Sequence, residues 1–299
     1  MKRQLLGVAA ILLSISTYAQ DNPLWMRYCA ISPDGTTIAF TYKGDIYTVP
    51  STGGRASQIT TNPAHDTKPI WSPDGKKIAF ASDRMGSMDI FEVNKEGGIP
   101  KRLTTHSGNE TPVAYKDAGH ILFLANIMPT AEDAQFPSGQ FQQVYEVNTE
   151  GGRPILFSSM PMEDISINHT GNTLLYHDKK GYEDPWRKHH TSSITRDIWL
   201  CSLNGNRTFR KQTAFNGEDR TPVWASDDKS FYYLSEEKGS FNIFKRDIDG
   251  NTSKQITNHT KHPVRFLSAA SNGTLCYGYD GEIYTVKELS LIHISEPTR

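Results

Sequence analysis

The stretch Ile31-Ser-Pro-Asp-Gly-Thr-Thr-Ile-Ala-Phe40 recurs as Trp71-Ser-Pro-Asp-Gly-Lys-Lys-Ile-Ala-Phe80, and this repeat decides the fold. Weaker copies occupy residues 114–123, 167–176, 224–233 and 269–277. The aromatic residues that end successive copies are 40, 43, 53, 57 and 44 residues apart. A period of this length indicates an array in which each copy is one supersecondary unit that packs against its neighbours.

Each copy continues with a second pattern, in which a polar residue precedes a β-branched and an aromatic residue. The instances are Asp45-Ile46-Tyr47, Asp89-Ile90-Phe91, Gln143-Val144-Tyr145, Asp197-Ile198-Trp199, Asn242-Ile243-Phe244 and Glu282-Ile283-Tyr284. This alternation is typical of a strand with one buried face. A turn that contains Gly and a short strand such as Gln58-Ile59-Thr60 come next. Together with the two strands around the Ser-Pro-Asp-Gly turn, a complete copy contains four strands.

The sequence therefore predicts an all-β protein, a β-propeller of about six four-stranded blades over residues 24–287, with the last blade incomplete. A helical array is excluded because apolar residues show no sustained helical spacing and Gly or Pro interrupts nearly every longer run. Pro33, Asp34 and Gly35 suit successive positions of a tight turn. We interpret the repeated Asp as structural and not as catalytic.

The sixth copy has three recognisable strands and ends near Val286. No Gly turn and no strand like Gln-Ile-Thr follow, and Leu24 to Arg27 could supply the missing outer strand from the other end of the chain. Residues 289–299 match nothing in the repeat and resemble translated sequencing-adapter sequence. We expect a truncated reading frame with a non-native tail, and a lower stability than an intact propeller would have.

The N-terminus has the layout of a secretory signal peptide over residues 1–19. Lys2 and Arg3 precede an apolar run over residues 5–15, and Thr17 and Ala19 are small residues at the expected cleavage site. We therefore expect export to the periplasm, with no membrane attachment after the signal is cleaved.

The charge of the chain bears on nucleic-acid binding, and its cysteines bear on disulfide formation. The net charge is −1, with acidic and basic residues mixed along the chain, which argues against a nucleic-acid partner. The three cysteines, Cys29, Cys201 and Cys276, each lie in an apolar run, and we expect free buried thiols. A Cys29–Cys276 bridge would require that the ring close the first blade against the last.

Two insertions, at residues 126–142 and 178–196, are the places where a propeller would carry a binding loop. The second contains the candidate substrate-binding residues Trp186, Arg187, Lys188, His189 and His190, although this loop could instead pack against the rim. Adjacent histidines on a strand point to opposite faces, which argues against a metal site. No nucleophile elbow, Rossmann or phosphate-loop pattern occurs. The sequence thus predicts no catalytic residues, no metal and no cofactor.

The blades resemble TolB-type, WD-like propeller repeats. More specifically, Gly181-Tyr-Glu-Asp-Pro-Trp-Arg-Lys-His-His-Thr-Ser-Ser-Ile-Thr-Arg-Asp-Ile-Trp199 resembles the fourth blade of the N-terminal propeller of exported bacterial tricorn-like serine peptidases. The resemblance covers roughly residues 24–287.

That resemblance implies a parent protein in which a second propeller, a peptide-binding PDZ domain and a catalytic region with Ser and His follow. The propellers of this family are thought to filter unfolded peptides on their way to or from an enclosed active site. We therefore expect a non-catalytic substrate-access or scaffold module whose partners are peptides or unfolded polypeptides and the downstream peptidase domains of the same parent chain.

Two other interpretations stay open from the sequence. The first is a free-standing TolB-like periplasmic propeller that binds a protein or peptide. The second is the propeller of a prolyl-oligopeptidase-type hydrolase, which requires an α/β-hydrolase domain with a nucleophile elbow.

Overall fold

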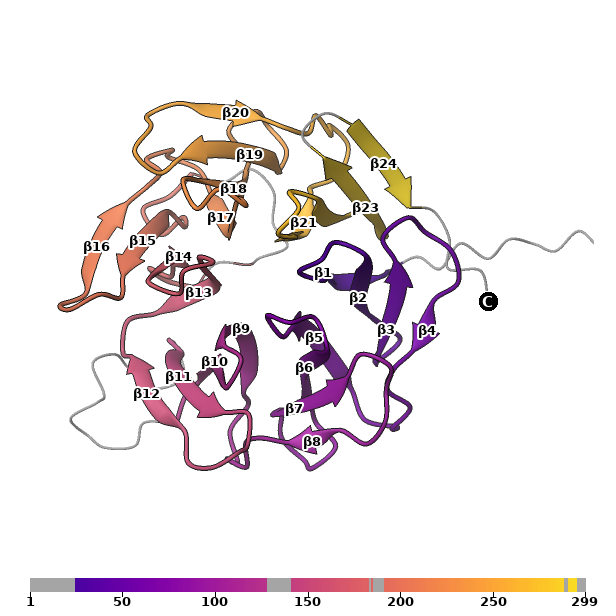
Figure 1. The fold of residues 1–299 in the computed structure, drawn as a ribbon. Helices are drawn as coiled ribbons and strands as arrows, with labels where there is room; N and C mark the ends of the chain where they lie inside the picture. Colours follow the sequence, from indigo (N-terminus) through magenta and orange to yellow (C-terminus); the bar gives the residue numbers. More distant parts are fainter. Residues whose placement is uncertain (1–24, 128–140, 183, 185–190, 288–289, 295–299) are drawn as a thin grey trace, which may run out of the picture.

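The computed structural model describes residues 25–127, 141–182, 184 and 191–287, together with the backbone of residues 290–294. Six four-stranded antiparallel sheets surround a central axis, and strands follow one another in chain order within each sheet. Figure 1 shows the first strand of each sheet nearest the axis and the fourth at the outside. The predicted all-β propeller of six four-stranded blades is confirmed.

The blades follow the chain order. Blade one contains β1 (Arg27–Ile31), β2 (Thr37–Tyr42), β3 (Asp45–Pro50) and β4 (Ser57–Gln58), and blade two contains β5 (Asp66–Trp71), β6 (Lys77–Ser82), β7 (Asp89–Asn94) and β8 (Lys101–Arg102). Blade three contains β9 (Thr111–Asp117), β10 (His120–Ala125), β11 (Gln143–Asn148) and β12 (Ile155–Ser158), and blade four contains β13 (Met162–Ile167), β14 (Thr173–Asp178), β15 (Ile198–Ser202) and β16 (Thr208–Lys211). Blade five contains β17 (Asp219–Trp224), β18 (Ser230–Ser235), β19 (Asn242–Asp247) and β20 (Ser253–Gln255), and blade six contains β21 (Arg265–Ala269), β22 (Leu275–Tyr279), β23 (Glu282–Lys287) and β24 (Ser290–Ile294).

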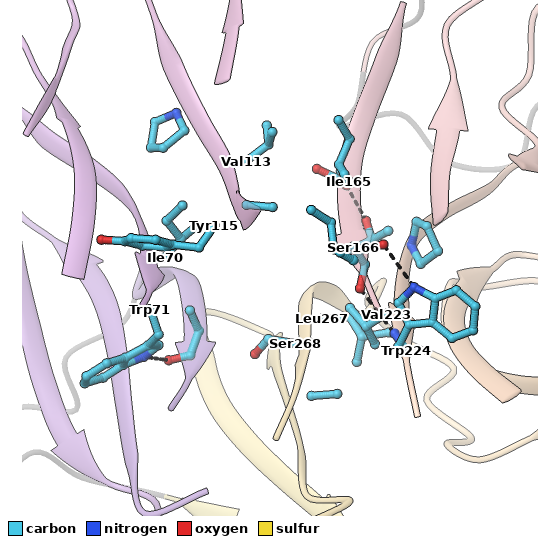
Figure 2. A pocket seen from close by; sticks show the side chains of 18 of the residues that line it. Ile70, Trp71, Val113, Tyr115, Ile165, Ser166, Val223, Trp224, Leu267 and Ser268 are labelled. Atoms are coloured by element: carbon cyan, nitrogen blue, oxygen red, sulfur yellow. Dashed lines mark hydrogen bonds between the residues drawn. The ribbon is translucent and has the colours of Figure 1, made fainter. Parts of the chain in front are cut away.

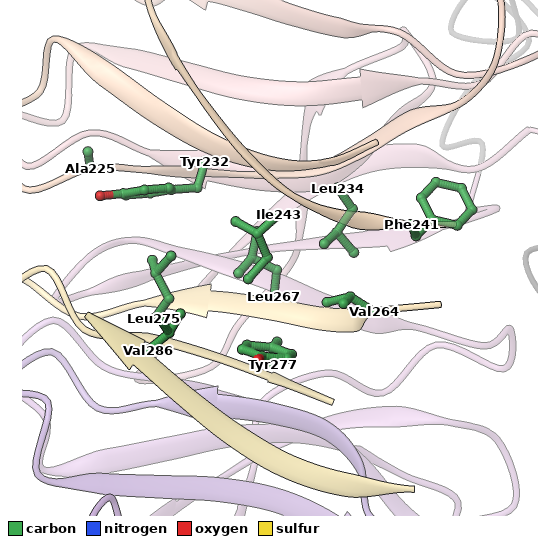
Figure 3. Packing of buried hydrophobic residues seen from close by; sticks show 10 residues of the cluster. All are labelled: Ala225, Tyr232, Leu234, Phe241, Ile243, Val264, Leu267, Leu275, Tyr277 and Val286. Atoms are coloured by element: carbon green, nitrogen blue, oxygen red, sulfur yellow. The ribbon is translucent and has the colours of Figure 1, made fainter. Parts of the chain in front are cut away.

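The hydrophobic core lies between neighbouring blades. Each blade packs its alternating apolar residues against the next sheet, so that one cluster of buried side chains fills each blade interface. Figure 3 shows the cluster between blades five and six, where Leu234 and Ile243 face Leu267, Leu275 and Tyr277. Because these clusters lie between blades, each blade is stabilised by its neighbours.

The Ser-Pro-Asp-Gly turn has the structural role that the sequence predicted. The amide of Gly35 donates to the carbonyl of Ser32 at 2.8 Å, and Gly35 has a φ of 76° that favours glycine. The Asp34 carboxylate accepts the Thr36 amide at 3.0 Å and the Ser32 hydroxyl at 2.5 Å. Hydrogen bonds from Ser32 and Thr36 hold the pKa of Asp34 below its usual range. This aspartate is therefore committed to its own turn.

A repeated Thr just after the fourth strand explains the polar residue of the third strand. The Thr60 hydroxyl donates to Asp45 at 3.0 Å and accepts the Ile46 amide at 3.0 Å. Thr257 makes the equivalent pair of bonds with Asn242 and the Ile243 amide. The short outer strand ends before it can pair with this amide of the third strand. The Thr hydroxyl accepts the hydrogen bond of the amide instead.

Among the described residues, blade six is completed by β24 and not by a strand from the N-terminal end. Arg27 begins β1 and pairs with Thr41 of β2, so the expectation that Leu24 to Arg27 could complete blade six is wrong. The outer position is occupied by β24, which pairs antiparallel with β23 although its sequence lacks the pattern of the other fourth strands. Three strands of this blade carry the repeat. Leu24 and the predicted signal peptide over residues 1–19 lie outside the described residues.

Candidate functional site

The innermost strands of the six blades, β1, β5, β9, β13, β17 and β21, line a central cavity of about 1170 Å³. Figure 2 shows apolar side chains from several blades converging on it, among them Ile70, Val113, Val223 and Leu267. This volume exceeds the usual range for small-molecule sites, about 300–1,000 Å³. The cavity therefore has room for an extended polymer segment.

Two tryptophans fix neighbouring inner strands to each other at the cavity wall. The indole Nε1 of Trp71 donates to the carbonyl of Ala30 in the preceding blade at 2.8 Å. Trp224 makes the same bond to the carbonyl of Ser166 at 3.0 Å. The Trp that opens the Ser-Pro-Asp-Gly repeat thus sets the spacing between blades, and with it the shape of the cavity.

A bulge interrupts each inner strand at the same place. The pairing of β1, β5, β13, β17 and β21 with the second strand shifts register there. The bulge residues are Tyr28, Lys68, Asp164, Thr221 and Phe266, with φ values of 52°, 53°, 48°, 52° and 57°. All five line the cavity, and we call them the bulge ring. In β9 the register shift leaves Pro112 at this position, where the proline ring excludes a positive φ.

The positive φ of the bulge ring is a costly conformation for residues with a side chain. It is uncommon for any residue other than Gly and an outlier for a β-branched residue such as Thr221. Strain of this kind costs about 1–3 kcal/mol per residue and concentrates at functional sites. A bulge also re-aims a side chain. In five blades the backbone therefore adopts a strained conformation at a residue that lines the cavity.

Contacts among ring members connect adjacent blades. The Thr221 hydroxyl donates to Asp164 Oδ2 at 2.7 Å, and the Tyr28 and Phe266 rings lie 4.8 Å apart at 54°. The Lys68 ammonium lies 5.7 Å from the centre of the Tyr28 ring. Burial lowers the pKa of Lys68, although Asp164 and Glu163 act against this effect. The ring thus combines two aromatic rings, an ammonium, a carboxylate and a hydroxyl.

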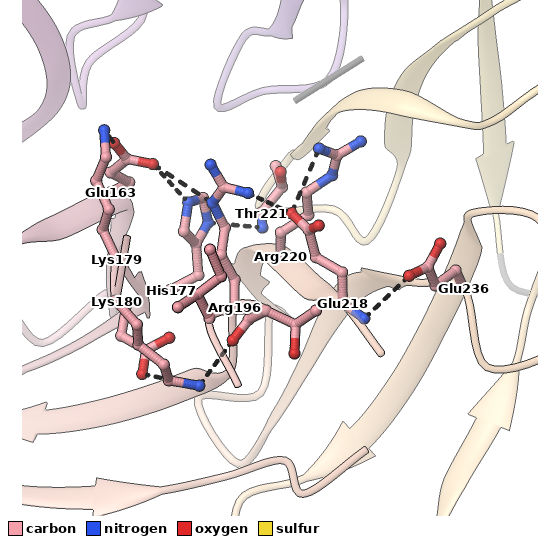
Figure 4. A network of polar contacts seen from close by, with 12 residues as sticks. Glu163, His177, Lys179, Lys180, Arg196, Glu218, Arg220, Thr221 and Glu236 are labelled. Carbon is pink, nitrogen blue, oxygen red and sulfur yellow. Dashed lines mark hydrogen bonds and ion pairs between the residues drawn. The ribbon is translucent and has the colours of Figure 1, made fainter. Parts of the chain in front are cut away.

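Behind Asp164 a network of charged side chains joins blade four to blade five (Figure 4). Glu163 accepts a hydrogen bond from Lys179 Nζ at 2.7 Å, and its carboxylate lies 3.2 Å from His177 Nε2. The other ring nitrogen, His177 Nδ1, accepts a hydrogen bond from the Thr221 amide at 3.3 Å. Burial alone would raise the pKa of Glu163, but hydrogen bonds and charge from His177 and Lys179 outweigh it and hold the pKa well below its usual range. Glu163 is therefore an ionised structural partner.

The network continues along blade five through a buried arginine pair. Arg196 Nη1 donates to Glu218 Oε1 at 2.5 Å, and Arg220 Nη1 lies 3.7 Å from the same oxygen. Burial lowers the pKa of Arg220 to about 10, and the positive charges of Arg265 and Arg196 add to this effect. Glu163 also lies 3.5 Å from Arg196 Nε, so Arg196 contacts two carboxylates, and Arg265, whose charge acts on Arg220, lines the cavity wall.

The predicted binding residues Trp186, Arg187, Lys188, His189 and His190 lie outside the described residues, so their prediction stays untested. The flanking Tyr182 lines the central cavity and is 91% exposed. Burial lowers the pKa of Arg265, and the negative charge of Asp184 opposes this effect in part. The part of the insertion that precedes the candidate residues therefore lies near the cavity, through Tyr182.

The sequence reasoning missed the bulge ring. Its signal was present, because the ring residues stand three positions before the residue that precedes Ser-Pro-Asp-Gly, as Tyr28 does before Ile31 and Lys68 before Trp71. The position that follows each ring residue is apolar in all five blades (Cys29, Pro69, Ile165, Pro222 and Leu267), whereas the ring residues vary in chemical type. A variable position inside a repeated strand could have indicated a functional surface.

The described part of the chain contains neither a metal-binding cluster nor a helix that could span a membrane. No group of three or more His, Cys, Asp or Glu side chains among those residues is placed to hold a metal ion. Within the same residues, no helix reaches the length and apolarity that a membrane crossing requires.

Comparison with known proteins assigns this architecture to a family. The profile described as the tricorn protease N-terminal beta propeller domain matches residues 23–290. Tricorn protease homolog 1 from Streptomyces coelicolor is 25% identical over 269 residues, which cover 89% of this chain and 24% of that protein. A tricorn protease homolog from Saccharolobus solfataricus is 27% identical over 272 residues, covering 87% of this chain and 23% of the relative. The chain thus spans about a quarter of the length of these relatives.

Solved structures show the same fold. The crystal structure of the tricorn protease superposes with a TM-score of 0.75 at 20% sequence identity, over 92% of this chain and 26% of that one. TolB from Acinetobacter baumannii superposes with a TM-score of 0.64 at 13% identity, over 91% of this chain and 65% of that one. At these identities the two superpositions concern the fold alone.

Proposed function

Since this chain belongs to the tricorn protease N-terminal β-propeller family, we propose that it is a non-catalytic substrate-access module of an exported serine peptidase, and that its central cavity takes up extended peptides. The observation that carries the proposal is the bulge ring, in which five blades accept a strained backbone to direct side chains into one cavity. Strain that is repeated at equivalent positions supports a function of the cavity.

The chemistry of the ring suits a varied peptide better than one small ligand. Tyr28 and Phe266 offer apolar and aromatic surface, while Lys68 and Asp164 offer charges of both signs. Side chains of different kinds placed around one axis can contact different residues of a passing chain. A site for a single small molecule would instead converge a few polar groups on one point.

The inner strands also discourage a peptide from joining a sheet. An inner strand is an edge strand, and an edge normally invites a further strand through its free amides and carbonyls. Here Pro69, Pro112 and Pro222 remove amide donors, and the bulges interrupt the regular spacing. A peptide in the cavity would therefore be held by side chains and could leave again, as an access module requires.

Peptide binding by the full chain tests the role of the cavity. Fluorescence anisotropy with a labelled unstructured peptide should show binding, and Phe266→Ala should weaken the affinity by about fivefold or more because an aromatic contact is lost. Phe209→Ala is the matched control, since Phe209 is 39% exposed in β16 at the outer edge of blade four. Equal affinities for the two variants would contradict the proposal.

A separate measurement tests whether the chain cleaves the peptide that it binds. Mass spectrometry of the same peptide after long incubation should show it intact, whereas specific cleavage by the purified chain would overturn this part of the proposal. Sequencing the gene beyond the codon for Lys287 tests the link to a peptidase. We expect an open frame that encodes a serine peptidase region, and a stop codon directly after a blade-six strand would contradict it.

Export is likewise part of the proposal, supported by the signal-like residues 1–19. Expression in a Gram-negative host should place the protein in the periplasmic fraction, with Gln20 as its first residue by N-terminal sequencing. Retention of Met1 in a cytoplasmic product would contradict export.

A further inference from the structure

The seam between blade six and blade one is the place where the first and the last blade of the chain meet. The strands of blade one all come from the first part of the chain and those of blade six from the last, so no strand is shared across the seam. Its backbone contacts include the Met26 amide to the Gly281 carbonyl at 3.1 Å and the Ser271 amide to the Pro33 carbonyl at 2.9 Å. Every other pair of neighbouring blades is joined directly by a connecting segment.

Two cysteines lie in the apolar cluster at this seam. Cys29 of β1 and Cys276 of β22 are both free and buried, and both belong to the apolar cluster between blades six and one. Ser268 pairs with Cys276 across β21 and β22, and its Oγ accepts a hydrogen bond from the Ile31 amide of β1 at 3.0 Å. The Cys29 thiol donates to the Phe266 carbonyl of β21 at 3.4 Å, and the Ser268 hydroxyl donates to the Cys29 carbonyl at 3.5 Å. The two cysteines therefore lie in the same buried cluster, one on each side of the seam.

We propose that Cys29 and Cys276 form a disulfide that fastens the last blade to the first when the chain folds in an oxidising compartment. The bond forms when the two thiols lose two protons and two electrons. The electrons pass to the disulfide of a thiol–disulfide oxidoreductase, which is reduced to a dithiol through a mixed-disulfide intermediate. The relevance in the cell rests on the proposed export, since disulfides persist in such compartments.

The closed ring restricts when this reaction occurs. Burial raises the pKa of the Cys276 thiol well above its usual range, and the neighbouring Cys29 raises it further. Because the thiolate is the attacking species, the folded seam reacts slowly. Exchange therefore takes place while the seam is still open during folding, and the finished bond is then protected from reduction.

The position of the pair makes the bond effective. A cross-link stabilises mainly by restricting the unfolded chain, and the entropic effect grows with the length of the closed loop. The loop between Cys29 and Cys276 contains nearly the whole propeller. Cys201 offers an internal control, because it is buried in the cluster between blades three and four, away from the seam.

The experiment refolds the full chain in oxidised or in reduced glutathione and then blocks free thiols under denaturing conditions. After refolding with oxidised glutathione, we expect a protein lighter by two hydrogen atoms, a linked peptide that joins Cys29 to Cys276, and alkylation of Cys201 alone. The melting temperature should exceed that of the reduced protein by about 5–10 °C.

Two variants make the test independent of packing effects. Cys29→Ala/Cys276→Ala should melt at one temperature in both redox conditions, whereas Cys201→Ala should retain the redox-dependent shift. Complete alkylation of Cys29 and Cys276 after oxidative refolding, or a linked peptide that contains Cys201, would overturn the inference. Because the refolding is carried out with the purified chain, a failure of export would leave this result unaffected.

Discussion

The hydroxyl of Thr221 donates to Asp164 Oδ2 at 2.7 Å, and the two residues occupy equivalent bulges of neighbouring blades. This bond connects two members of the bulge ring and couples the shape of the cavity to the packing of blades four and five. Replacing Thr221 by Val keeps the β-branched shape and removes the hydroxyl.

Thr221→Val should destabilise the propeller by about 1 kcal/mol, the usual net contribution of one hydrogen bond. Urea denaturation measures the change, with Thr52→Val as the control because Thr52 lies exposed in the turn after β3. An equal stability of the two variants would show that the bond between the bulges contributes nothing.

The tryptophan bonds between blades give a second prediction. Trp71→Phe and Trp224→Phe should each cost about 1–3 kcal/mol, because a carbonyl at the blade interface loses its indole donor and part of the packing is lost. Trp25→Phe is the control, since Trp25 is 70% exposed. Thermal unfolding should separate the first two from the third, and a similar melting temperature for all three would contradict this role of the repeated Trp.

Two repeated turns differ in what surrounds their glycine. A Cβ on Gly35 would lie 2.4 Å from Asn272 Nδ2, which donates to the Asp34 carbonyl across the seam, whereas a Cβ on Gly75 would approach Pro33 Cδ only to 3.5 Å. Both glycines have positive φ, so both substitutions carry the same backbone strain. Gly35→Ala should therefore destabilise the protein by about 1 kcal/mol more than Gly75→Ala in urea unfolding. The reverse order would show that Asn272 moves away at no cost.

Buried carboxyl groups predict how stability depends on pH. Desolvation raises the pKa of Glu110 from 4.5 to about 7, so the folded protein holds this proton more tightly than the unfolded chain does. Stability from this group is complete below the unfolded value and falls as pH rises through about 7. Between pH 5.5 and 8 the loss from Glu110 alone should be about 2 kcal/mol.

Glu110→Gln tests this dependence, and Glu150→Gln is the control because Glu150 is an exposed partner of Lys101. The free energy of unfolding of the parent protein should decline more steeply from pH 5.5 to 8 than that of Glu110→Gln. Parallel curves would contradict the raised pKa. Glu163 does not interfere, because its lowered pKa makes its contribution constant above the unfolded value and lost only in acid.

The fold could be predicted because its determinants are local and repeated. Ser32, Asp34 and Gly35 complete a turn with one another, and Thr60 completes the third strand of its own blade. The outer strand of blade six could not be predicted in this way, since β24 pairs with β23 through backbone bonds that require no particular side chains.

The candidate site was less accessible to sequence reasoning. The bulge ring depends on a φ value that the pattern of apolar residues does not encode, and on blades that are distant in sequence, as Tyr28 and Phe266 are. The adjacency of Cys29 and Cys276 likewise required the ring to close. The sequence indicated the loop after β14 instead, because its charged and aromatic residues depart visibly from the repeat.

Photo-crosslinking of a bound peptide tests the central claim most directly. A peptide with a photoreactive residue would be bound to the full chain, cross-linked and mapped by mass spectrometry. We predict cross-links on the innermost strands, β1, β5, β13, β17 and β21, with Tyr28 and Phe266 among the modified residues. Cross-links confined to outer strands such as β16 and β20 would show that peptides bind outside the cavity and would contradict the account.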